Sequence, residues 1–151
     1  MVFLFSRAPR PSQAELQGDA AFSRHEVETA ISLWEQALTR VPSEALYQKL
    51  TGAYIVTQDL SMARQRAEDG LTRFPDCVNL QVNLALIAFY QRKYDETLAL
   101  TERVLAVNDH QPDAHYLRAL VYQARGEHER ARQELVKEVN VNPGSRRAWE
   151  K

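Results

Sequence analysis

The sequence predicts an all-α fold made of stacked helix pairs, and three regularities of the chain lead to this prediction. Apolar stretches end at three prolines, Pro42, Pro75 and Pro143. An alanine stands 12 residues before each proline, at Ala30, Ala63 and Ala131. The stretches recur with a period of about 34 residues, which is typical of helix–turn–helix solenoids.

The period divides the chain into about four repeats, at residues 11–43, 44–77, 78–111 and 112–145. The last three repeats begin 34 residues apart, and the first is in phase once one residue is dropped at its junction. An apolar N-terminal segment, residues 1–10, precedes the repeats. Residues 146–151 follow them as a stub or cap.

Each repeat contains two helical patterns, and the second repeat has the clearest. Its apolar face follows the spacing i, i+3, i+4 and i+7, which predicts one side of a helix. The residues at this spacing are Tyr47, Leu50, Thr51 and Tyr54. Asp59 is placed to cap the next helix, and Pro75 is placed to end it.

Small residues recur at one place in each helix of a pair, where the two helices must approach closely. The first helices have Gly18, Thr51, Ala85 and Ala119 at this place. The second helices have Ala30, Ala63, Thr97 and Ala131. One helix pair buries too little apolar surface alone, so stacking of the repeats must supply the stability.

With these positions in register, the chain resembles the tetratricopeptide repeat family over roughly residues 11–143. The family motif is a small residue, an aromatic residue three later, an alanine nine after the aromatic, and a closing proline. The second and fourth repeats match it best, with Thr51, Tyr54, Ala63, Pro75 and Ala119, Tyr122, Ala131, Pro143. The third departs most, with Ala88, Thr97 and Asp109 at the later positions. The resemblance implies a right-handed α–α superhelix whose first helices line a concave groove.

The two ends of the chain carry their own expectations. Glu138 stands where earlier repeats have small or apolar residues, so we expect the last helix to be a polar, solvent-facing cap. Trp149 either caps the last repeat or is exposed for dimer contact. The apolar run Val2–Phe5 either occupies the groove, packs on the first repeat or is disordered.

Composition limits the function. The 151 residues include 19 basic and 20 acidic side chains, with a net charge of −1, so no basic field indicates RNA or other nucleic-acid binding. The single cysteine, Cys77, cannot form a disulfide within the chain and is expected in the core. The N-terminal apolar run is too short for a signal peptide or a membrane span, so we expect no membrane insertion and a cytoplasmic location.

No catalytic motif, phosphate-binding loop or dinucleotide fingerprint is present, so the sequence predicts a protein that is not an enzyme and needs no cofactor. His110 and His115 lie close in sequence to Asp109 and Asp113, in an expected turn between repeats. Their spacing matches no standard zinc pattern, so we interpret them as a solvated turn and predict no metal site.

The resemblance places a set of apolar, aromatic and amide residues on the groove. The predicted protein-binding residues are Lys49, Ile55, Asn79, Asn83, Leu86, Phe89, Tyr90, Tyr116 and Leu120. The surface lacks the basic clamp by which some family members hold a C-terminal carboxylate, since only Asn83 matches it and Asp113 would repel an anion. We hypothesise that Phe89, Tyr90 and Tyr116 anchor a partner segment. The alternative is that they belong to the core between repeats.

These features predict a non-catalytic protein-interaction module, an adaptor, co-chaperone or assembly factor that binds an apolar or amphipathic segment of a partner protein or peptide. The alternative is a scaffold in which terminal repeats join identical copies into a homo-oligomer.

Light scattering after gel filtration separates these two functions. We expect a monomer whose mass does not change with concentration. A defined oligomer would favour the scaffold instead.

Overall fold

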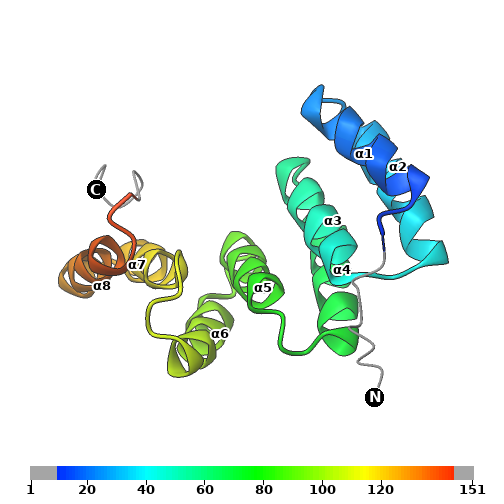
Figure 1. Cartoon of the computed structure of the whole chain (residues 1–151). Helices are drawn as coiled ribbons and strands as arrows, with labels where there is room; N and C mark the ends of the chain where they lie inside the picture. Colours follow the sequence, from blue (N-terminus) through cyan, green and yellow to red (C-terminus); the bar gives the residue numbers. More distant parts are fainter. Residues whose placement is uncertain (1–9, 145–151) are drawn as a thin grey trace, which may run out of the picture.

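A computed structural model describes residues 10–144 of the chain and shows an all-α solenoid (Figure 1). Trp149 and the Val2–Phe5 run therefore lie outside the described residues. Within 10–144 the chain forms eight helices and no strand. They are α1 (Gln13–Ser23), α2 (Val27–Arg40), α3 (Glu44–Val56), α4 (Leu60–Arg73), α5 (Val78–Tyr90), α6 (Tyr94–Val107), α7 (Ala114–Ala124) and α8 (His128–Val141).

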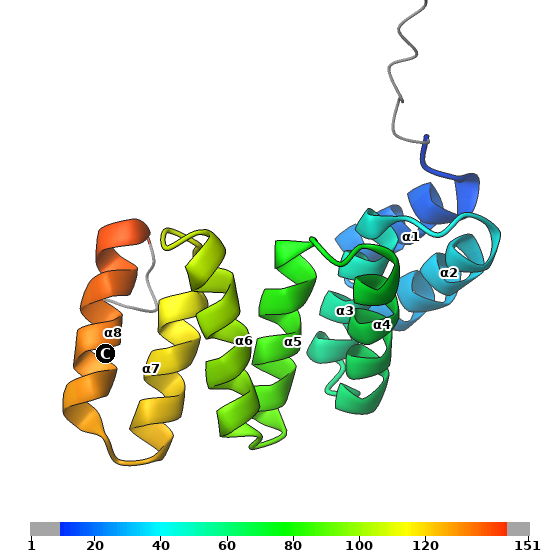
Figure 2. The same ribbon diagram turned by 90° about the horizontal axis from the view of Figure 1, so that it is seen from below.

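The helices pack as four consecutive pairs, and each predicted repeat contains one pair. The first helices form a row in which α5 contacts both α3 and α7. In Figure 1, α4 and α6 lie below this row and α8 lies at its left end. In Figure 2 the pairs α5/α6 and α7/α8 stand upright, whereas α1 and α2 are turned relative to them. This progressive rotation is the superhelical twist of a solenoid.

Local signals set the helix ends as the sequence predicts. The Asp59 side chain accepts a hydrogen bond of 3.2 Å from the Met62 N–H at the start of α4. Ser12 and Ser43 cap α1 and α3 in the same way. Helices α2, α4 and α8 each end two residues before a proline, because a residue that precedes proline disfavours the helical conformation.

The helices of each pair cross at the predicted small residues. A Cβ added at Gly18 would lie 2.5 Å from Trp34 Cδ1, a contact that no side chain tolerates. In the third pair, the Thr97 hydroxyl donates across the crossing to the Ala85 carbonyl, at 3.1 Å. The other crossing positions are buried too: Ala30, Thr51, Ala63, Ala119 and Ala131.

The last repeat is less apolar than the rest. Arg118 stands one period after Leu84 and two after Leu50, which are both buried. Its guanidinium donates to the Leu98 carbonyl at 3.0 Å and to the Thr101 hydroxyl at 3.3 Å. Hydrogen bonds therefore hold α7 on α6 where earlier repeats use leucine.

The expectation that Glu138 belongs to a solvent-facing cap is wrong. Glu138 is 0% exposed, and its Oε1 accepts a hydrogen bond of 3.1 Å from the Asp113 N–H, at the start of α7. Asp113 has a left-handed backbone with φ of 70°, and the buried carboxylate satisfies the amide of this strained turn. Among residues 10–144, Oε2 of Glu138 has no hydrogen-bond partner.

The turn inside each helix pair places one residue in the left-handed region. This residue is Gly126 in the last pair, with φ of 75°, but the matching residues of the other pairs are His25, Gln58 and Arg92, with φ of 63°, 63° and 60°. A residue with a Cβ is strained in this conformation, and glycine is not.

This strain leads to a testable prediction. We expect Gln58→Gly to raise the free energy of unfolding by about 0.5–1 kcal/mol, because the relief of strain exceeds the added freedom of the unfolded chain. The reverse change, Gly126→Ala, should lower it by about 1 kcal/mol. Urea unfolding of both variants measures these shifts. A destabilised Gln58→Gly would contradict this explanation.

Candidate functional site

The inner face of the solenoid is formed by α1, α3, α5 and α7 and carries the predicted binding residues. Helix α5 lies in the middle of this row and has no charged side chain along Val78–Tyr90. Tyr90 at its end is 53% exposed. Residues Asn83, Leu86 and Phe89 of the same helix are half-buried, so α5 presents an uncharged, partly apolar surface.

The aromatic residues of this face differ in exposure. The Phe89 ring lies 5.9 Å from the ring of Tyr90 and 5.7 Å from that of Tyr94, which starts α6. Phe89 therefore joins the exposed Tyr90 to the half-buried Tyr94, while Tyr116 and Leu120 on α7 are half-buried. Of the three predicted anchors, Tyr90 is exposed, whereas Phe89 and Tyr116 are half-buried.

Amides form a small network beside α5. The exposed Asn79 donates to Gln48 Oε1 at 3.3 Å, and Gln48 donates to the Cys77 sulfur at 3.4 Å. Cys77 is buried, as predicted, and burial raises the pKa of its thiol. The thiol is therefore held in its neutral form, unlike a reactive cysteine.

Lys49 is not a free cation on this face. Its Nζ lies 2.8 Å from Glu15 Oε1 and 2.9 Å from Asp19 Oδ1, both on α1. Burial alone would lower the pKa of Lys49, but the hydrogen bonds to Glu15 and Asp19 outweigh burial and raise it. The sequence prediction missed these partners. Glu15 lies 34 residues before Lys49, which is one repeat period. This spacing of opposite charges is the sequence feature that could have predicted the ion pair.

Two hollows lie beside the first repeats. A cavity of about 400 Å³ opens between α1 and α3, lined by residues that include Phe22, Lys49 and Gly52. A larger one of about 660 Å³ lies between the starts of α1 and α3, against Pro42 and Phe74. Ile55 is half-buried and packs against the apolar cluster that contains Leu84 and Ile87.

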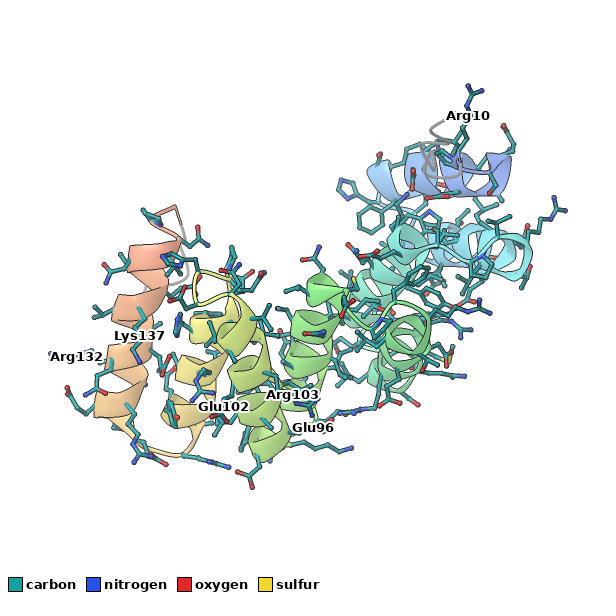
Figure 3. The ribbon with its side chains drawn as sticks, turned by 60° about the horizontal axis from the view of Figure 1, so that its bottom comes forward. Arg10, Glu96, Glu102, Arg103, Arg132 and Lys137 are labelled. Carbon is teal, nitrogen blue, oxygen red and sulfur yellow. The ribbon has the colours of Figure 1, made fainter. Side chains whose placement is uncertain are left out.

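The second helices carry charges of both signs. Figure 3 labels Glu102 and Arg103 on α6, and Arg132 and Lys137 on α8. These two helices therefore do not form the continuous basic surface that would bind the phosphate backbone of a nucleic acid. Within residues 10–144, no cluster of three or more His, Cys, Asp or Glu side chains is placed to hold a metal ion. No helix of this part of the chain is long and apolar enough to cross a membrane.

Residues 82–145 match the family model described as tetratricopeptide repeat, a span that includes most of the third and fourth predicted repeats. This part of the chain is similar to tetratricopeptide repeats. Solved structures show the same fold across both halves. No curated protein matches the sequence.

Three of the solved structures show how widely this fold is shared. A crystal structure of MamA has a TM-score of 0.75 and 22% identity, and covers 87% of this chain and 78% of its own. MamA from Desulfovibrio magneticus has a TM-score of 0.74 and 16% identity, and the match covers 89% of this chain and 78% of the MamA chain. A thermophilic tetratricopeptide repeat protein of Thermus thermophilus has a TM-score of 0.75 and 18% identity, and the match covers 89% of this chain and 75% of the Thermus chain.

The family match over residues 82–145 and the shared fold support a protein–protein interaction module. Its repeats are joined on the outer side by ion pairs. Glu35 on α2 forms two hydrogen bonds with Arg66 on α4, at 2.8 and 3.0 Å, and also accepts one of 2.9 Å from the Tyr54 hydroxyl on α3. Such links fix the angle between the first two repeats and hence the shape of the inner face.

The Tyr54 contact makes stability depend on pH. Burial, followed by the contact with Glu35, raises the pKa of Tyr54 to about 12. Since the pKa is raised on folding, the stabilisation is complete below the unfolded pKa of about 10 and is lost between about pH 10 and 12.

We therefore expect the wild-type protein to lose more stability over this pH window than Tyr54→Phe, which cannot ionise. Urea unfolding at about pH 9 and about pH 11.5, on either side of the unfolded tyrosine pKa, compares the two. Equal losses in both proteins would contradict the assignment.

Proposed function

We propose that the protein is an adaptor or assembly factor that holds an apolar or amphipathic segment of a partner protein against its inner face. The observation that carries the proposal is the middle helix of that face, α5, which lacks charged residues and ends in the exposed Tyr90. An uncharged face with an accessible aromatic suits the apolar side of a helix or an extended apolar segment.

The proposed contact surface runs from α3 to α7 and consists of the nine predicted residues. The uncharged ones supply apolar contact through Leu86 and Leu120 and hydrogen bonds through Asn79 and Asn83. Lys49 contributes as part of an ion pair rather than as a free charge. The centre of the surface is expected to contribute most of the affinity, because binding energy concentrates where water is excluded.

A capture experiment tests this proposal. We expect Tyr90→Ala with Tyr116→Ala to reduce partner capture from native cell extract at least about tenfold, the loss expected when one strong anchor is removed. The single Tyr90→Ala variant should show most of the effect, and it leaves the core intact because Tyr90 is exposed. Crosslinking followed by mass spectrometry measures capture.

The matched control is Val107→Ala, since Val107 is 85% exposed at the end of α6, among the second helices. Capture by this variant should equal that of the wild type. Circular dichroism establishes that each variant is folded. Undiminished capture by a folded double variant would refute the groove.

A further inference from the structure

Gly52 is a glycine that the packing of this protein does not require. It lies in the middle of α3, although glycine is among the poorest helix formers. Gly18 and Gly70 are explained by crowding, because an added Cβ would lie 2.5 Å from Trp34 and 2.7 Å from Leu80. At Gly52 an added Cβ would meet no atom within 4 Å. The space above the backbone is open.

This open space belongs to the cavity of about 400 Å³ between α1 and α3, which we call the α1/α3 slot. Its walls include Asp19, Phe22, Lys49 and Gly52. Phe22 is 41% exposed, and its ring is supported by the Trp34 ring at 5.5 Å. One side of the slot is therefore the Phe22 ring, which packs on Trp34, and another side is the backbone of α3 at Gly52.

Lys49 in the slot wall pairs with two carboxylates, Asp19 in the wall and Glu15 beside it. These three groups together have a net charge of −1. Asp19 and Lys49 are the charged residues that line the slot in the described chain. Asp19 Oδ1 accepts a hydrogen bond of 3.1 Å from the Trp34 indole N–H and lies 2.9 Å from Lys49 Nζ, whereas Oδ2 accepts one of 3.1 Å from Lys49. A carboxylate oxygen accepts two hydrogen bonds, so Oδ2 has capacity for one more donor.

We propose that the α1/α3 slot binds an arginine side chain of the partner segment, an inference that rests on the proposed function. The guanidinium donates to Asp19 Oδ2 and stacks on the Phe22 ring, which attracts a flat cation. The methylene stem lies over the Gly52 backbone. A carboxylate would be repelled, and a purely apolar side chain would leave Asp19 Oδ2 short of a hydrogen bond.

A titration monitored by NMR tests the slot directly. The probe is the peptide acetyl-Leu-Arg-Leu-amide, and the reporters are the Gly52 amide and the Trp34 indole N–H. We expect both signals to shift in a saturable way. The same peptide with citrulline in place of arginine has the same shape without the charge and should leave them unchanged.

Two variants locate the site. Gly52→Leu fills the slot and should weaken probe binding at least about tenfold, while raising the melting temperature by about 2–4 °C because leucine is the better helix former. Asp19→Asn keeps an oxygen for Trp34 but removes the charge, and should also weaken binding about tenfold. Gly70→Ala should instead lower the melting temperature, because its Cβ position is crowded.

Several results would overturn the arginine slot: no saturable shift with the arginine peptide, equal shifts with the citrulline peptide or with a lysine peptide, or unchanged binding by Gly52→Leu. The titration is independent of the capture experiment, because Tyr90 and Tyr116 do not line the slot. If the arginine peptide binds and the tyrosine variants still capture the partner, the proposed groove is refuted and the slot is not. If the arginine peptide does not bind and the tyrosine variants lose capture, the slot is refuted and the groove is not.

Discussion

The close crossing of two helices at small residues is the constraint on which this structure depends. The two helices of a pair can approach closely only at small residues such as Gly18 and Ala85. Large buried neighbours such as Trp34 then fill the remaining space. The crossing fixes the geometry of a pair, and each pair then packs on the next. The inner face exists because this unit is repeated with a small rotation, which places successive first helices side by side.

The sequence predicted much of this architecture, because the features that define it are local and periodic. The cap at Asp59 and the helix ends before the prolines follow from backbone chemistry that acts within a few residues. The family-model match falls on residues 82–145, which include the repeat that departs most from the motif. There Thr97 replaces alanine and still fits, because its hydroxyl is satisfied by the Ala85 carbonyl across the crossing.

The features that the sequence did not reveal depend on which side chains meet between elements. A charged residue at a terminal position suggests solvent, yet Glu138 is buried, because the left-handed turn at Asp113 needs an acceptor for its amide. Lys49 was predicted on the binding face, and the repeat period places its partner Glu15 opposite it. Sequence alone does not distinguish the crowded Gly18 and Gly70 from the open Gly52, because the difference lies in the side chains that surround each glycine.

The polar junction at Arg118 has a consequence for how the solenoid comes apart. In a linear array the stability is a sum of repeat terms and nearest-neighbour terms, and units open separately where a neighbour term is small. The first three pairs share apolar clusters that extend from α1 to α6. Helix α7 buries Leu117 and Val121 and is also held on α6 by hydrogen bonds from the Arg118 guanidinium. Water can replace those hydrogen bonds as α7 and α8 separate, so we expect the C-terminal pair to open first. Amide protons of α7 and α8 would then exchange with solvent sooner than those of α3, and proteases would gain their first access at this end of the described chain.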